Sequence, residues 1–180
     1  MKRRWLGLLA AFVIGLILLP GLFLLLAVTG RLSSDSVSAP PGWETEVGET
    51  ALDASLEGRA EGLQNPIAAG DEAALLAGMT LYGDNCAGCH GSLRGPSAWG
   101  SGGFYPRVPQ FWQEGHDHEH LTPAEAFAAV RDGIRYSGMG AWNGTLSEAE
   151  IWQVANFVSR MHELPPRVDA QWRAEPAADE

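Results

Sequence analysis

The stretch of residues 73–90, AALLAGMTLYGDNCAGCH, decides how the rest of this sequence is interpreted. It ends in two cysteines, Cys86 and Cys89, which are separated by two residues and followed directly by His90. The chain of 180 residues has two cysteines in all, too few for a disulfide framework. The spacing therefore points to a chemical group held at this one place rather than to a set of crosslinks.

Two thiols at this spacing, with a histidine directly after them, match the attachment pattern of a c-type haem. Each thiol can add to one vinyl group of the haem, and the histidine then lies beneath the iron as the proximal ligand. The imidazole needs a hydrogen-bond acceptor on its other ring nitrogen to fix the orientation of the ring. The motif thus predicts one covalent haem c, attached at Cys86 and Cys89 and ligated by His90.

A redox-active cysteine pair and a zinc site both fit the motif less well than a haem. A thioredoxin-like redox pair requires a preceding strand and a βαβ pattern, and the sequence shows neither. A zinc site normally requires four ligands, whereas this motif supplies at most three and the sequence has no second cysteine pair. A chance match in an exported protein is the remaining alternative.

An uncharged apolar run, residues 5–28 (WLGLLAAFVIGLILLPGLFLLLAV), follows Lys2, Arg3 and Arg4. At about 1.5 Å per residue it is long enough to cross a hydrocarbon core of roughly 30 Å. We therefore expect a single transmembrane helix with its cationic end in the cytoplasm and residue 31 onward on the periplasmic side. A cleaved signal peptide, with Ser38-Ala39 as the cleavage site, is the alternative, but its apolar core is usually shorter.

The part of the chain that follows the apolar run is acidic. From Arg31 onward there are nine arginines, no lysine and 22 acidic residues, a net charge of about −13. A nucleic-acid-binding protein needs a basic face to neutralise phosphates. The sequence therefore predicts that nucleic acid is not a partner.

Helical signals dominate the exported part. Capping-box patterns begin at Thr122 and Ser147, and each precedes apolar residues at helical spacing. Pro165-Pro166 stops the second helix, and no alternating strand pattern occurs. We expect an all-α chain with four parts: a membrane anchor (1–30), a flexible tether (31–70), a folded domain (71–164) and an acidic C-terminal tail (165–180).

Two segments resemble the class I cytochromes c. Residues 73–90 resemble the family's N-terminal helix and haem motif, and residues 133–161 (GIRYSGMGAWNGTLSEAEIWQVANFVSRM) resemble its methionine loop and C-terminal helix. The resemblance implies a small α-helical fold around one haem, histidine–methionine ligation of the iron, and electron transfer between redox partner proteins. It covers just over half of the chain.

The resemblance also implies roles for single residues. Met139 matches the distal iron ligand, although Gly140 stands where the family often has proline. Pro96 matches a proline whose carbonyl accepts the N–H of the proximal histidine, and Gly78 matches a glycine that lets the first and last helices cross closely. Tyr82 and Phe157 are then expected to pack at that crossing. Met79 and Met161 lie in helical stripes and are expected in the core.

Further residues stand out by their type and position. Four aromatic residues are expected to line the haem or its edge: Trp99, Phe104, Tyr105 and Trp142. The histidine-rich run His116–His120 is interpreted as a solvated polar loop. Copper or zinc binding by His116, His118 and His120, or their use as a haem ligand, is the alternative.

These features predict a membrane-anchored monohaem carrier of single electrons in a respiratory-type chain. Iron ligated on both faces leaves no position for a substrate, so we expect no enzymatic turnover. Two alternatives remain: a fixed haem subunit of a larger dehydrogenase or oxidase complex, and a haem enzyme or sensor in which Met139 is displaceable.

Overall fold

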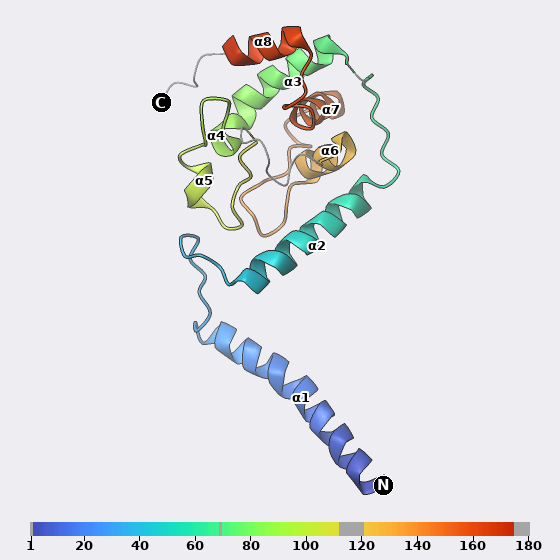
Figure 1. The fold of residues 1–180 in the computed structure, drawn as a ribbon, viewed down its shortest axis with the longest axis vertical. Coiled ribbons are helices and arrows are strands. Elements are labelled where there is room, and N and C mark those ends of the chain that lie inside the picture. The colour runs from blue at the N-terminus through green and yellow to red at the C-terminus, as the bar shows by residue number, and fades with distance from the viewer. Residues whose placement is uncertain (1, 69, 112–120, 175–180) are drawn as a thin grey trace. The chain divides into compact units, whose positions relative to one another are not determined.

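The computed structural model describes residues 2–68, 70–111 and 121–174, which form helices joined by loops (Figure 1). The helices are α1 (Lys2–Val28), α2 (Gly42–Ala60), α3 (Glu72–Asn85), α4 (Ala87–His90), α5 (Gly100–Gly103), α6 (Pro123–Asp132), α7 (Glu148–Val158) and α8 (Pro166–Ala174). Among these residues no strand occurs, and one isolated β-bridge joins Ser92 to Gly95. The all-α prediction is confirmed.

The chain divides into two units, Met1–Ser38 and Ala39–Glu180. In the first unit, α1 contains a 22-residue span, Gly7–Val28, with a mean hydropathy of 2.8 and 0% of its residues buried. Its length and composition suffice to cross a membrane. Pro20 lies inside the helix, as membrane helices tolerate. The first unit therefore fits the expected membrane anchor.

Helices α3 and α7 form the centre of the second unit and cross at Gly78. A Cβ atom at this position would lie 2.1 Å from the backbone oxygen of Gln153, closer than any real contact. Only glycine lets the two backbones approach this closely. The expected close helix crossing is confirmed.

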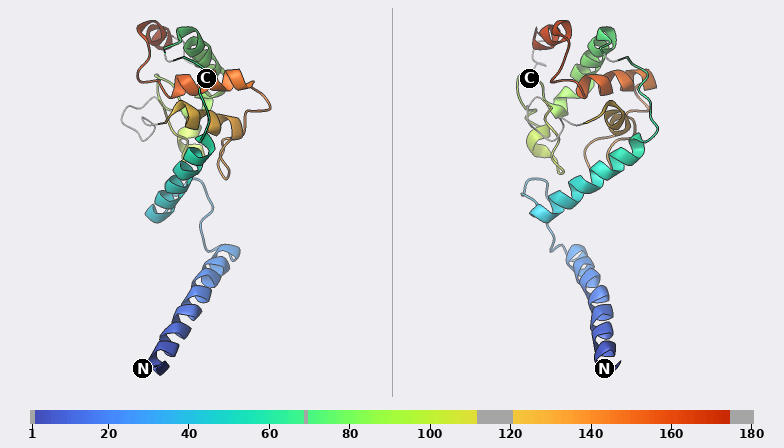
Figure 2. Two further views of the ribbon diagram at one scale, coloured as in Figure 1. Left: turned by 90° about the vertical axis from the view of Figure 1, so that its right-hand side faces the viewer. Right: turned by 45° about the vertical axis from the view of Figure 1, so that its right-hand side comes forward.

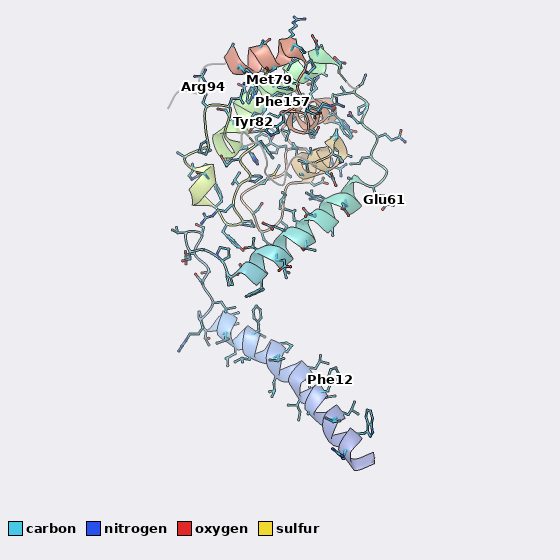
Figure 3. All side chains as sticks on the ribbon, in the orientation of Figure 1. Phe12, Glu61, Met79, Tyr82, Arg94 and Phe157 are labelled. Carbon is cyan, nitrogen blue, oxygen red and sulfur yellow. The ribbon has the colours of Figure 1, made fainter. Side chains whose placement is uncertain are left out.

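An aromatic cluster fills the space beside this crossing. The rings of Tyr82 and Phe157 lie 5.6 Å apart, and Figure 3 shows both next to Met79. Met79 is 0% exposed and Met161 is also buried. Both methionines are therefore core residues, as predicted.

Helices α6 and α7 begin at the two predicted capping boxes. The hydroxyl oxygen of Thr122 accepts from the N–H of Glu125, whose side chain accepts from the N–H of Thr122. Ser147 and Glu150 repeat this arrangement at the start of α7. The two helices pack through the stacked rings of Phe127 and Trp152, 4.0 Å apart.

Helix α2 differs from the flexible tether expected for residues 31–70. It packs against α6, as Figures 1 and 2 show, and Leu56 is its buried residue. A reciprocal pair of amide hydrogen bonds between Asn65 and Asn156 holds the segment that follows. The helix has one large buried side chain rather than an apolar stripe. Its sequence therefore lacks the repeat of apolar residues from which an amphipathic helix is predicted.

Helix α8 differs from the expected acidic tail of residues 165–180. Its Val168 and Trp172 are buried, and the indole ring of Trp172 lies 5.1 Å from the ring of Phe157. Proline is compatible with the first turn of a helix, so Pro166 begins α8 although the Pro165-Pro166 pair follows the end of α7. The aromatic cluster thus extends beyond the domain expected from sequence.

Candidate haem site

The Cys86–His90 segment forms a tight helical turn at the end of α3. The carbonyl oxygen of Cys86 accepts hydrogen bonds from the backbone N–H of Cys89 (3.0 Å) and of His90 (2.9 Å). Both cysteines are free thiols and half-buried. Side chains three residues apart in a helical turn lie on the same side, so the turn presents both thiols to one neighbour.

The Cys86 thiol lacks the property of a catalytic redox cysteine. Burial, and to a lesser degree the nearby Cys89, raises the pKa of Cys86 to about 12. Redox-active cysteine pairs have a lowered pKa, whereas structural buried cysteines have a raised one. The arrangement therefore disfavours a thioredoxin-like function and suits a thiol that is used once, for attachment.

The imidazole ring of His90 is oriented by the loop that follows. Its Nδ1 lies 2.9 Å from the carbonyl oxygen of Pro109, and its ring stacks on Phe111 with centroids 4.7 Å apart. A carbonyl oxygen only accepts hydrogen bonds, so Nδ1 carries the proton and the lone pair is on Nε2. Neutral imidazole in this tautomer is the form that ligates iron.

The assignment of this acceptor to Pro96 was wrong. A tight turn follows His90 immediately, with reciprocal backbone hydrogen bonds between Ser92 and Gly95. The carbonyl that His90 Nδ1 faces lies beyond this turn and beyond α5, at Pro109. The two prolines lie 6 and 19 residues after His90, and spacing alone did not indicate which one returns to the ring.

Three residues that no sequence pattern indicated hold the backbone of the motif. The Gln110 side chain donates to the carbonyl oxygen of Cys89 (2.9 Å) and accepts from the N–H of Ser97 (2.8 Å). The Ser97 hydroxyl donates to the carbonyl oxygen of Gly88. Gly100 lies against Cys89, where a Cβ atom would be 1.8 Å from the carbonyl oxygen. The loop thus fixes the turn that bears the thiols.

Tyr82 holds the other side of the motif. Its phenol donates a buried hydrogen bond of 2.8 Å to the carbonyl oxygen of Gly91. Burial, and then the nearby Cys86, raises the pKa of Tyr82, so the phenol keeps its proton. Tyr82 therefore joins the aromatic cluster to the residue that directly follows His90.

Met139 lies on the loop between α6 and α7, residues 133–147, here called the Met139 loop. Hydrogen bonds within the loop close it. Its carbonyl oxygen accepts from the N–H of Ile134 (3.0 Å), and its N–H donates to the Ser137 hydroxyl oxygen (3.1 Å). Its side chain is half-buried at the edge of the α6–α7 core, which Cys86 also borders. Gly138 is needed because a Cβ atom there would lie 2.5 Å from the Phe104 ring.

The predicted aromatic residues divide between two places. Phe104 contacts Gly138 of the methionine loop, and its ring lies 4.5 Å from that of Trp99. Trp99 itself is 64% exposed. Trp142 packs on the α6–α7 core together with Met139. Phe104 and Trp142 thus lie on or beside the Met139 loop, Trp99 contacts Phe104, and Tyr105 precedes Pro106 at a cis peptide bond.

Residues 112–120, including His116, His118 and His120, lie outside the described residues. Within the described part of the chain, no three His, Cys, Asp or Glu side chains gather as they would around a metal ion. The donor set that the described structure offers is therefore the two thiols, the imidazole of His90 and the thioether of Met139. Two free thiols on one turn and a histidine with its Nε2 lone pair fit a covalent haem.

Residues 73–158 match the family model described as "Cytochrome C oxidase, cbb3-type, subunit III". This segment is a cytochrome c domain. It contains the Cys86–His90 turn, Met139 and the α3–α7 crossing, so the match covers the whole candidate site. The fold and the resemblance to class I cytochromes c agree with it.

Among curated proteins, the chain is similar to the "Cbb3-type cytochrome c oxidase subunit CcoP" of Cereibacter sphaeroides. The two are 35% identical over 92 residues, which is 48% of this chain and 28% of the relative. The chain thus covers little more than a quarter of the relative's length. No solved structure matches the chain.

Proposed function

We propose that this protein is a monohaem one-electron carrier whose haem c is attached at Cys86 and Cys89 and ligated by His90 and Met139. The observation that supports this proposal most directly is the hydrogen bond of 2.9 Å between His90 Nδ1 and the Pro109 carbonyl oxygen. It fixes the orientation of an imidazole that directly follows two free thiols, as an iron ligand requires. The match of residues 73–158 to a cytochrome c family supports the same function.

The residues of the chain control an iron that, when the haem is bound, takes up and releases one electron. His90 supplies a nitrogen ligand held in one orientation, and Met139 supplies a neutral thioether. A thioether ligand and a buried, apolar environment favour the ferrous state and raise the reduction potential. Two protein ligands leave no iron position for a substrate, which supports a carrier rather than an enzyme.

Acid–acetone treatment tests the attachment. Because thioether bonds survive denaturation, one haem per chain is expected to stay with the denatured protein. The variant with both Cys86 and Cys89 replaced by alanine is the matched control, and any haem that it binds is expected to be extracted. Complete extraction from the parent protein would contradict the proposal.

Spectra of the Met139→Ala variant test the sixth ligand. This variant is expected to have a lower reduction potential and to bind carbon monoxide in the ferrous state. Met79→Leu, a volume-conserving change at a fully buried methionine, is expected to retain the parent potential. Parent-like behaviour of Met139→Ala would exclude this residue as the ligand and direct the search to His116, His118 and His120.

A fixed subunit of a terminal oxidase is the second candidate. Both the family model and the curated relative carry the name of a cbb3-type oxidase subunit. Membranes dissolved in mild detergent distinguish the two functions by native mass. A mobile carrier elutes alone, whereas a subunit elutes with partners that retain oxidase activity.

The proposed location is the cytoplasmic membrane, with the haem domain on the periplasmic side. Lys2, Arg3 and Arg4 precede the apolar span, and cationic flanks remain cytoplasmic. Protease added to the outer face is expected to release a haem-containing fragment, and protease added to the inner face is not. Recovery of mature protein that begins near Pro40 would instead indicate a cleaved signal peptide.

A further inference from the structure

Helix α2 contacts the start of the methionine loop through one side chain. Arg59, in the last turn of α2, donates from Nη1 to the carbonyl oxygen of Gly133 at 3.0 Å. The two residues are 74 positions apart in the sequence. Arg59 also precedes residues 73–158, the segment that matches the cytochrome c family. The contact therefore joins the matched domain to a helix outside it.

Gly133 is the residue from which the Met139 loop departs. It ends α6 with a φ of 69°, a conformation that favours glycine. A Cβ atom at Gly133 would lie 2.8 Å from the Met139 carbonyl oxygen. The next residue, Ile134, donates its N–H to that same oxygen. A displacement of the Gly133 backbone is therefore transmitted directly to the Met139 backbone.

The positive charge of Arg59 strengthens its hydrogen bond to the Gly133 carbonyl oxygen. The guanidinium is half-buried, and within the described part of the chain its Nε has no hydrogen-bond partner. Hydrogen bonds from charged donors are stronger than those from neutral donors, particularly away from solvent. Nη1 thus hydrogen-bonds this half-buried guanidinium to the α6–loop junction, where the charge of Arg59 also acts on Asp132.

We propose that Arg59 is a positioning residue for the loop that carries Met139, so that docking of α2 stabilises methionine ligation of the iron. The inference rests on the proposed role of Met139. The described hydrogen bond of Arg59 goes to Gly133 rather than to a thiol or an iron ligand, so Arg59 acts through Gly133. Since α2 follows the membrane unit in the chain, movement of α2 away from α6 would release the distal ligand.

Imidazole binding to the ferric, full-length holoprotein tests the proposal, because imidazole must displace the Met139 thioether. Arg59→Met removes the charge and the donors but keeps the length of the side chain. We expect imidazole to bind about tenfold more tightly to this variant, equivalent to about 1.4 kcal/mol. Arg167→Met is the matched control, since Arg167 is exposed and pairs with Glu72 at 3.8 Å. Equal imidazole affinities in the two variants would overturn the proposal.

A second variant covers the case in which Arg59→Met does not fold. Leu56→Ala removes the buried side chain of α2 and leaves Arg59 unchanged. It weakens the docking of α2, so we again expect tighter imidazole binding than in Arg167→Met. A parent-like affinity in Leu56→Ala, with α2 shown to be undocked by proteolysis within residues 42–60, would overturn the proposal.

Amide hydrogen exchange separates this inference from the proposed function. The N–H of Ile134 donates to the Met139 carbonyl oxygen at 3.0 Å, so its exchange rate reports the loop directly. We expect about tenfold faster exchange in Arg59→Met, whether or not Met139 ligates iron. Parent-like exchange would refute the role of Arg59. Parent-like spectra of Met139→Ala would instead refute the ligand assignment.

Discussion

At the scale of single residues, one side chain that hydrogen-bonds to the haem motif also packs against a distant part of the chain. The phenol of Tyr82 reaches the Gly91 carbonyl oxygen beside His90, and its ring lies 5.8 Å from that of Trp172 near the C-terminus. The same side chain therefore supports both the core and the motif. Its two roles can be separated because phenylalanine keeps the ring and removes the hydroxyl.

Tyr82→Phe is expected to lower the free energy of unfolding by about 1–3 kcal/mol, because the buried Gly91 carbonyl loses its described donor. Denaturant unfolding of the holoprotein measures the change. Tyr136→Phe is the matched control, since Tyr136 is 91% exposed, and it is expected to unfold like the parent. A loss of stability in both variants would contradict the role assigned to the buried hydroxyl.

The same residue makes stability depend on alkaline pH. Burial raises the pKa of Tyr82 in the folded protein, whereas in the unfolded chain it is about 10. Above that pH the unfolded chain releases the phenolic proton and the folded chain retains it, so the free energy of unfolding falls as pH rises. We expect a shallower fall between pH 9 and 11, roughly one unit on either side of the unfolded pKa, in Tyr82→Phe. Identical slopes would show that Tyr82 does not contribute.

Gly78→Ala tests the close crossing of α3 and α7. Its Cβ atom would lie 2.1 Å from the Gln153 backbone oxygen, so the helices must separate. We expect a loss of at least about 3 kcal/mol, the upper end for overpacked cores, measured by thermal unfolding. Gly144→Ala is the control because nothing lies within 4 Å of its Cβ position. Similar midpoints for the two variants would argue against the crossing.

Single-residue roles were predictable from sequence only where chemistry is local. The two thiols and His90 are marked by residue type and spacing, whereas the role of Gly78 came from the resemblance to class I cytochromes c. The acceptor for His90 was not, because the path of a loop decides whether Pro96 or Pro109 reaches the ring. Arg59 gave no signal either, since its partner is a backbone oxygen 74 residues away.

At the scale of elements, helices with a strong local signal were predicted and helices that depend on tertiary contacts were not. The capping boxes at Thr122 and Ser147 predicted the starts of α6 and α7. Helix α8 has its buried Val168 and Trp172 one turn apart, a pattern too short to stand out in a polar segment. Its stability comes from the aromatic cluster rather than from its own sequence.

Trp172→Ala tests whether α8 belongs to the folded unit. Trp172 is 5% exposed and contacts both Tyr82 and Phe157. Removing a buried tryptophan is expected to cost about 3–5 kcal/mol, measured by denaturant unfolding. Trp172→Phe is expected to cost less, because within the described residues the indole N–H has no partner. Unfolding of Trp172→Ala at the parent midpoint would show that α8 is dispensable.

At the scale of the whole molecule, the negative charge is unevenly distributed. Helix α2 carries five acidic residues and one arginine. The surface near Met139 has few acidic residues: Asp132 is paired with Arg131 at 2.8 Å, and Arg135, Tyr136 and Ala141 are exposed. A partner that docks beside Met139 therefore meets a surface without the acidic excess of α2, whereas the net charge of about −13 from Arg31 onward acts over longer distances.

This distribution predicts that electron transfer in intact membranes depends little on ionic strength. If membrane tethering, rather than long-range attraction, keeps the domain near its partner, salt has little to screen. Stopped-flow oxidation of the reduced protein in membrane vesicles, at increasing salt, measures this dependence. A steep fall in rate would indicate a strongly basic partner.

A protease site inserted after Ser38, the boundary of the two units, then tests the tether itself. Cleavage is expected to slow the reaction and to make it concentration-dependent, since the domain loses its raised local concentration. An unchanged rate after cleavage would mean that the membrane anchor contributes nothing to the encounter.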